Sequence, residues 1–396
     1  MADSAVKSIT IYPLVIPMRR TVSHAASQRA VADPVVVAVE LNSHVVGYGE
    51  TLARPYVTGE TTDTVIDAIQ TLFSQHLLNL HPPSFPEALE AVEALPCRDA
   101  MGTAVPAARA AVELALLDAY SRHFQRPIAD ACGWMGFNAF GQPGSIGTIH
   151  HSGVLAAAET RTMKRTLRSL WWYGIRDFKI KVGNDGDESR LRSAWKYLRR
   201  SIAAGRATLR VDVNGAWTLS EAMRYISAWR DFSLAAVEQP LPKGHERELP
   251  DLKACVHTPL MYDESLVSLD DARLLVDLQV ADAFNIRISK CGGFLPALRL
   301  AHFARKHRVW IQLGCMVGET SILSAAGRRF LELVPEVRFV EGSFGSFLLR
   351  GDVVHRPVRF GYAGRVKPLP GTGWGINVDT SKLTELTVDK PICVEF

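Results

Sequence analysis

The chain has 396 residues, of which 47% are hydrophobic, and its 45 lysines and arginines nearly balance its 41 aspartates and glutamates. A chain of this length is too long for one ordinary domain and has enough apolar residues for a large core. No basic stripe with interleaved aromatic residues is present, which argues against nucleic-acid binding, and no apolar run approaches the roughly 18 residues that cross a bilayer.

The cysteines and the first residues indicate a cellular compartment. The six cysteines are scattered and include no Cys-x-x-Cys pair, which is typical of reduced thiols and not of a disulfide framework or a zinc site. Met1-Ala2-Asp3-Ser4 does not lead through a basic segment into an apolar stretch, so we expect no signal peptide. These features predict a cytoplasmic protein without membrane partners.

The first 130 or so residues combine strand-like and helix-like segments. Apolar runs predict antiparallel strands at 9–15, 35–41 and 45–49. Helices are predicted at about 61–78, 86–95 and 103–123. The last helix is so rich in alanine and leucine that we expect other helices to bury it.

From about residue 145, strand-like and helix-like segments alternate along the chain. The predicted strands are 145–150, 177–182, 208–213, 234–239, 259–263, 283–289, 310–315 and 337–341. The strand ends recur at roughly 25–31 residues, which is the length of one β-crossover-α unit. Eight such units would close a parallel barrel with its helices outside. The last 50 or so residues, rich in proline and glycine, are expected to form a loop returning from the barrel to the first region.

Three acidic residues, Asp212, Glu238 and Asp263, each close a short apolar run. A carboxylate that ends a buried strand is costly unless positive charge lies opposite it. Because the three recur at near-even spacing, we expect their strands to converge on one hard cation. Carboxylate oxygens suit Mg²⁺ better than a softer metal, and Mn²⁺ could substitute for it. Taken singly, each could instead be a helix cap or a surface ion pair.

Lys179 and Lys181 lie two residues apart on one predicted strand, so both side chains point to the same face. Like charge and burial both lower a lysine pKa, and a lysine near neutrality can act as a general base. Asn214 follows Asp212 at the same spacing one unit later. Asn214 would support the cation or a lysine, although an asparagine before a glycine also favours a turn.

Lys290 follows the sixth predicted strand and would stand roughly opposite Lys181 in barrel order. Two bases that flank one cation suit removal of a proton alpha to a carboxylate, with one lysine at each face of the carbon. We therefore predict that the partner is a small-molecule carboxylate substrate.

Together these motifs resemble the enolase superfamily, and within it the muconate-lactonizing-enzyme (mandelate racemase/muconate cycloisomerase-like) subgroup. The matching runs are Lys179-Ile180-Lys181, Asp212-Val213-Asn214, Glu238-Gln239-Pro240, Asp263-Glu264-Ser265, Lys290, Gly47-Tyr48-Gly49-Glu50 and Pro370-Gly371-Thr372-Gly373. A lysine base with Mg²⁺ stabilising an enediolate is the established pattern of that superfamily, so this chemistry belongs to the resemblance. The resemblance implies one essential Mg²⁺, with Lys181 and Lys290 as acid/base residues and Lys179 tuning Lys181.

The resemblance also implies an α/β fold, a modified (β/α)8 TIM barrel of the (β/α)7β type with an α+β capping domain. We expect the capping domain at 1–135, the barrel at 140–344, and at 345–396 a C-terminal segment that returns to the capping domain. Members of the family often form oligomers, so a homo-oligomer is expected.

Substrate contacts are expected from a mobile loop at 17–29, which in this family closes over the site, and from the strand ends. The candidates are His24, Tyr56, His150, Glu264, Glu319 and Phe344. Glu319 lies in a run that has one residue more than the Gly-x-Met-x-Glu run of the family.

The eighth strand end bears on the overall reaction. Dipeptide epimerases of the subgroup carry Asp-x-Asp where this chain has Gly342-Ser343-Phe344, although nearby Glu341 could partly substitute. The run 344–349 is more similar to that of cycloisomerases. We therefore predict a muconate-cycloisomerase-like isomerase first, then a racemase or epimerase of an amino-acid derivative, then a dehydratase or o-succinylbenzoate-synthase-like lyase.

A rival of another class is a barrel that binds metal and ligand without turnover. A binding protein has no need of two opposed bases, so Lys181 and Lys290 argue against that hypothesis.

Overall fold

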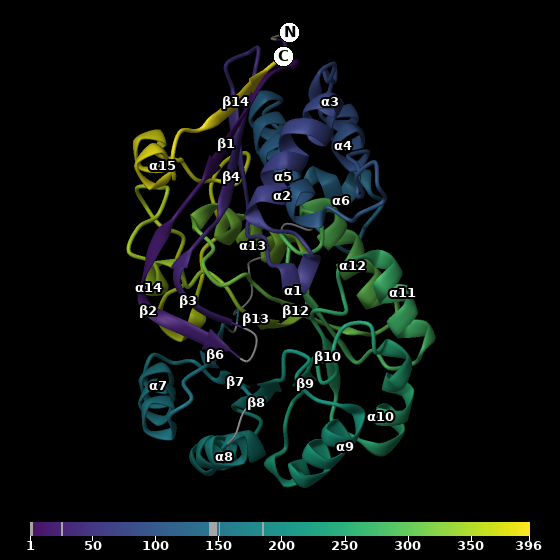
Figure 1. The fold of residues 1–396 in the computed structure, drawn as a ribbon, viewed down its shortest axis with the longest axis vertical. Coiled ribbons are helices and arrows are strands. Elements are labelled where there is room, and N and C mark those ends of the chain that lie inside the picture. Colours follow the sequence, from purple (N-terminus) through teal and green to yellow (C-terminus); the bar gives the residue numbers. More distant parts are fainter. Residues whose placement is uncertain (1–2, 25–26, 142–148, 150, 184–185) are drawn as a thin grey trace.

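The computed structural model describes residues 3–24, 27–141, 149, 151–183 and 186–396. Its larger part is an eight-stranded parallel sheet (Figure 1). The strands are β6 (Ser152–Leu155), β7 (Asp177–Lys181), β8 (Thr208–Asp212), β9 (Val237–Glu238), β10 (Leu260–Tyr262), β11 (Ala283–Ile286), β12 (Trp310–Leu313) and β13 (Val337–Val340). They pair in chain order, and a parallel bridge between His151 and Val340 joins the two edge strands into a barrel.

Helices follow the first seven strands and cover the outside of the barrel (Figure 1). They are α7 (Thr160–Trp172), α8 (Asp187–Ala203), α9 (Leu219–Ala228), α10 (Leu249–Cys255), α11 (Leu269–Asp277), α12 (Phe294–Lys306) and α13 (Ser321–Leu333). Strand β13 is followed directly by the short α14 (Gly345–Leu348) in place of a full barrel helix. The modified barrel of the (β/α)7β type that the resemblance implies is therefore confirmed.

A second, antiparallel sheet lies at the other end of the molecule, where both chain termini meet (Figure 1). Its order is β14 (Ile392–Glu395), β1 (Val6–Pro13), β4 (Val35–Leu41) and β5 (Val46–Thr51). The helices beside it are α1 (Pro55–Thr58), α2 (Thr62–Ala68), a π-helical turn at Ile69–Phe73, α3 (Ser74–Leu77), α4 (Phe85–Glu93), α5 (Pro106–His123) and α6 (Asp130–Trp134). We call residues 3–141 of this part the cap.

Helix α5 is the centre of the cap, as its alanine-rich sequence predicts, because nearly all of its residues are buried. Strand β5 lies directly on it. A Cβ added at Gly49 would stand 2.0 Å from the carbonyl oxygen of Ala111, so only glycine permits this approach.

The structure differs from the sequence-based expectations in two segments, the loop at 17–29 and the C-terminal loop. The predicted loop at 17–29 belongs to a β-hairpin formed by β2 (Ile16–His24) and β3 (Ser27–Ala32), whose strands pair at Ile16–Ala32 and Val22–Arg29. The predicted strand at 145–150 lies almost wholly outside the described residues. The expected C-terminal loop contains the helix α15 (Thr380–Leu386) and the strand β14. No helix among the described residues is long and apolar enough to cross a membrane.

Two buried carboxylates of the cap hold helices of the barrel. Glu50 on β5 accepts hydrogen bonds from the backbone N–H groups of Thr320 (2.7 Å) and Leu323 (2.9 Å) at the start of α13. Glu113 on α5 accepts from the N–H groups of Phe294 (2.9 Å) and Leu295 (2.7 Å) at the start of α12. Each carboxylate therefore satisfies helix N–H groups that have no partner within their own helix.

Glu113 should make the stability of the protein depend on pH. Burial raises the pKa of Glu113 to about 7, above the usual value of 4.5 for a glutamate. Between these values the folded state holds a proton that the unfolded chain has released, so the free energy of unfolding falls as the pH rises. The slope is up to about 1.4 kcal/mol per pH unit. The Glu113→Gln variant has no titratable group at this position. We therefore expect its free energy of unfolding, measured by denaturant unfolding at several pH values, to depend less on pH, by the contribution of about one proton.

The control for this experiment is Glu87→Gln, which replaces an exposed glutamate on α4 and should leave the slope as in the parent protein. An identical slope in the Glu113→Gln variant would contradict the prediction.

Candidate active site

The acidic residues singled out in the sequence lie at adjoining strand ends. Strand β8 ends at Asp212, β9 ends at Glu238, and Asp263 directly follows β10. The register pairs Asp212 with Glu238, and all three side chains are fully buried. Parallel strands bring their carboxyl ends to one end of the barrel, which is why residues so far apart in sequence become neighbours.

Each of the three carboxylates is paired with a protein cation. The ammonium nitrogen of Lys179 lies 3.1 Å from Glu238 Oε2 and 3.3 Å from Asp212 Oδ2. Asp263 accepts from Lys290 Nζ at 2.8 Å through one oxygen and pairs with Arg287 through the other. Within the part of the chain that the structure describes, no three His, Cys, Asp or Glu side chains are gathered in a metal-binding arrangement.

The donor set nevertheless fits a hard divalent cation. Glu264, next to Asp263, has one buried oxygen without a hydrogen-bond partner, while its other oxygen accepts from the Asn214 amide at 3.1 Å. Burial raises the pKa of Glu264, and the charges of Asp212 and Glu238 raise it further. Negative charge is thus crowded on this side of the site, and carboxylate oxygens are the ligands that Mg²⁺ prefers.

Lys179 and Lys181 lie on the same face of β7, as their spacing predicts, but they have different surroundings. Lys181 donates to Asn214 Oδ1 at 2.9 Å and lies 3.2 Å from Asp212 Oδ2. Lys179 is fully enclosed and also contacts Glu341 Oε2 at 2.9 Å. Burial alone would lower the pKa of Lys179, but Glu238, Glu341 and Asp212 together hold it well above its usual value. The expectation of a lowered pKa is therefore wrong for Lys179, whose pKa is raised by its carboxylate partners.

Lys290 lies in the turn between β11 and α12, and its ammonium group has three acceptors. These are the backbone oxygen of Asp263 (2.6 Å), Asp263 Oδ1 (2.8 Å) and the backbone oxygen of Asn285 (2.8 Å). The side chain is completely buried, and burial lowers the pKa of Lys290 to about 8. In the eight-stranded ring, β7 and β11 are four strands apart in either direction, so Lys181 and Lys290 come from opposite sides of the barrel.

A cavity of about 400 Å³ lies over these strand ends, between the barrel and the cap. The predicted site residues on its wall are Lys179, Lys181, Asn214, Tyr56, Glu264, Glu319 and Phe344. Asp212, Glu238, Asp263 and Lys290 are not among its described wall residues, and all four are fully buried. Much of the remaining wall is apolar, with Val154, Leu155, Met163, Leu170, Met316 and Leu348. His24 ends strand β2, but its side chain lies outside the described part of the chain, as does all of His150.

Glu341, which follows β13, points into the barrel. Its Oε2 accepts from Lys179 (2.9 Å), and its Oε1 accepts from Arg210 (3.2 Å). Both oxygens are therefore engaged by fixed cations, which does not favour Glu341 as the partner of a substrate ammonium. Sequence reasoning did not single out Arg210 or Arg287. The strand pattern could have indicated Arg210, since it lies two residues before Asp212 on β8 and residues two apart on a strand face the same way.

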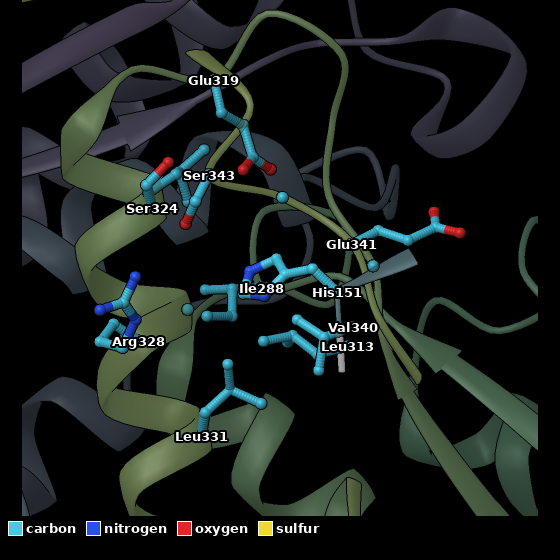
Figure 2. Close-up of a pocket in the computed structure, with 14 residues that line it drawn as sticks. His151, Ile288, Leu313, Glu319, Ser324, Arg328, Leu331, Val340, Glu341 and Ser343 are labelled. Carbon is cyan, nitrogen blue, oxygen red and sulfur yellow. The ribbon is translucent and has the colours of Figure 1, made fainter. Parts of the chain in front are cut away.

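A smaller polar pocket adjoins the cavity (Figure 2). Its polar lining residues are His151, Glu319, Ser324, Arg328, Glu341 and Ser343, and the last strand end separates it from the larger space. Glu319 borders both spaces and accepts a hydrogen bond from the Met316 N–H at 2.5 Å. Burial raises the pKa of Glu319 to about 8, so this side chain faces the cavity mostly as a neutral acid at pH 7.

Comparisons with known proteins agree with this architecture. Residues 8–133 match the model of the mandelate racemase / muconate lactonizing enzyme N-terminal domain, and residues 162–382 match the enolase C-terminal domain-like model. The chain is 28% identical over 392 residues to the N-succinyl-L-Arg/Lys racemase of Bacillus cereus, covering 98% of this chain and 99% of that protein. It is 30% identical over 288 residues to the muconate cycloisomerase 1-2 of Acinetobacter lwoffii, covering 71% and 70%.

A solved structure has the same fold. The dipeptide epimerase of Cytophaga hutchinsonii, complexed with Mg and the dipeptide D-Ala-L-Val, superposes with a TM-score of 0.84 at 21% identity and covers 99% of this chain and 100% of that one.

Proposed function

Because the chain belongs to the mandelate racemase / muconate lactonizing enzyme family and is an isomerase of the enolase superfamily, we propose that it racemises or epimerises an N-acylated amino acid. The observation that carries this proposal is the origin of Lys181 and Lys290 from opposite sides of the barrel, on β7 and after β11. Inversion at one carbon needs one group that removes a proton from one face and another that returns a proton to the other face.

The proposed reaction is a proton exchange at the α-carbon of the substrate. Lys181 as the free amine takes the α-proton, and the electron pair of the broken C–H bond moves into the substrate carboxylate to give an enediolate. Lys290 as an ammonium ion then donates a proton to the opposite face and is left as an amine. The reverse direction exchanges the two roles. Asn214 Oδ1, 2.9 Å from Lys181 Nζ, orients that lysine.

Asp212, Glu238 and Asp263 are the proposed ligands of Mg²⁺, with Glu264 beside them. When bound, the cation supplies positive charge next to the substrate carboxylate, which favours removal of the α-proton. Lys179 adds a fixed positive charge on the same side, because its three carboxylate partners keep it protonated.

The cavity favours an acylated nitrogen over a free ammonium group. A substrate ammonium needs an ionised carboxylate partner, but Glu341 is already paired with Lys179 and Arg210. Glu319, the other acid near this end of the cavity, is mostly neutral at pH 7. The nearly full-length similarity to an N-succinyl amino-acid racemase supports the same choice and favours the racemase hypothesis over the cycloisomerase hypothesis, which the sequence analysis put first.

A muconate-type cycloisomerase is the second candidate, and it rests on the 30% identity to the enzyme of Acinetobacter lwoffii over 71% of this chain. The two hypotheses differ in their products, since racemisation inverts one centre whereas cycloisomerisation forms a lactone.

The test is ¹H NMR in D₂O with Mg²⁺, using each enantiomer of N-succinyl and N-acetyl amino acids, free dipeptides, and cis,cis-muconate. We expect the α-proton signal of an N-acyl amino acid to disappear while the opposite enantiomer accumulates. Lactone formation from muconate with no exchange in the N-acyl series would overturn the proposal in favour of the second candidate. An absence of turnover in all series would favour the rival hypothesis of a barrel that binds metal and ligand without catalysis.

A further inference from the structure

The turn that carries Lys290 is held from outside the barrel. Ser289, the residue before Lys290, lies with its hydroxyl oxygen 2.7 Å from that of Thr51, at the end of β5 in the cap. The Leu52 N–H also donates to Ser289 Oγ, at 3.3 Å. Thr51 and Ser289 are buried, so water does not compete for these bonds.

The other end of the same turn is fixed to helix α5 of the cap. The guanidinium group of Arg109 donates to the backbone oxygen of Gly292, and Glu113 binds the first N–H groups of α12. The fit is tight, because a Cβ added at Gly293 would stand 2.5 Å from the Glu113 carboxyl group. The cap therefore holds residues 289–295 on both sides of Lys290.

Among the described hydrogen bonds and ion pairs, none joins Lys181 to the cap. Its ammonium group is bound by Asp212 and Asn214, and its backbone oxygen accepts from Arg190 on α8 at 2.9 Å. All of these partners belong to the barrel. One proposed base is thus fixed by the barrel alone, whereas the backbone of the other is fixed by the cap.

We infer that Thr51 and Ser289 are positioning residues that set where Lys290 stands relative to the substrate α-carbon, so that the cap controls proton transfer at one face only. This inference rests on the proposed function. Barrel groups direct the Lys290 ammonium through Asp263 and Asn285, whereas the Thr51–Ser289 contact joins the turn to the cap. Proton transfer is sensitive to such placement, since a displacement of about 1 Å can cost about 100-fold in rate.

Thr51→Val removes the hydroxyl group and keeps the shape of the side chain, and Ser289→Ala breaks the same contact from the barrel side. The matched control is Ser121→Ala. Ser121 is also fully buried and accepts from the Gly373 N–H at 2.8 Å, but it joins α5 to the C-terminal segment, away from Lys290.

The measurement is the rate of α-proton exchange in D₂O for each enantiomer of one N-acyl amino acid, with Lys290→Ala identifying the enantiomer that depends on Lys290. We expect Thr51→Val and Ser289→Ala to slow exchange of that enantiomer by about 10- to 100-fold and to leave the other nearly unchanged. Ser121→Ala should keep the parent ratio of the two rates.

Equal slowing of both enantiomers would show a merely structural contact and overturn the inference, as would an unchanged ratio. A parent protein that exchanges no α-proton would instead overturn the proposed function, and the inference with it.

Discussion

Lys181→Ala should abolish racemisation and reduce α-proton exchange of one enantiomer by about 100- to 10,000-fold, which is the usual contribution of a general base. Lys181 is the proposed base that lies on the cavity wall, and Asn214 and Asp212 fix its direction. The opposite enantiomer should still exchange its α-proton through Lys290 but should no longer invert. Exchange without inversion is the result that distinguishes two opposed bases from a single base.

The measurement is ¹H NMR in D₂O for both enantiomers, combined with chiral chromatography of the products. Lys196→Ala on α8 is the matched control, because it removes an exposed lysine that is far along the chain from any strand end. Circular dichroism would verify that the Lys181→Ala variant is folded. Racemisation at the parent rate in the folded variant would remove Lys181 from the mechanism.

The barrel was predictable because its strands repeat one physical pattern. In β7, Phe178 and Ile180 face the helices and are fully buried, while Lys179 and Lys181 face inward. This alternation, repeated at the spacing of a crossover unit, indicates a parallel barrel from sequence alone. The hairpin β2–β3 was not predictable in this way, because its two strands form a sheet of their own and do not repeat the spacing of the barrel.

The neighbourhood of the three carboxylates was predictable for a related reason, since the carboxyl ends of parallel strands must meet. The hydrogen-bond and ion-pair partners of the side chains in the site were not predictable. Glu341 is bound by Lys179 on β7 and Arg210 on β8, which are not neighbours of β13 in the sheet, and no local pattern predicts such contacts. The carboxylates of Glu238, Glu341 and Asp212 together reverse the expected pKa shift of Lys179. The contact between Thr51 and Ser289, beside Lys290, joins residues 238 positions apart and depends on how the two parts of the chain pack.

Asp263→Asn should weaken Mg²⁺ binding by at least about 100-fold, because even groups that only support a metal ligand change affinity by about 10- to 100-fold. Asp263 is fully buried, and its two oxygens are bound by Lys290 and Arg287. An amide keeps one acceptor oxygen but loses the negative charge, so it binds a divalent cation poorly and also leaves Lys290 and Arg287 less well paired. The lost negative charge and the poorer pairing of these cations both weaken Mg²⁺ binding.

Isothermal titration calorimetry with Mg²⁺ alone measures this effect without any substrate, so the result does not depend on which reaction the enzyme catalyses. Asp270→Asn is the control, since Asp270 is exposed on α11 and pairs only with Arg273 among the described ion pairs. Arg287→Met separates the two effects, because it removes a competing cation from Asp263 while the carboxylate remains. We expect this variant to bind Mg²⁺ at least as tightly as the parent protein. Unchanged Mg²⁺ affinity in Asp263→Asn would exclude Asp263 from the ligand set and place the cation on Asp212, Glu238 and Glu264.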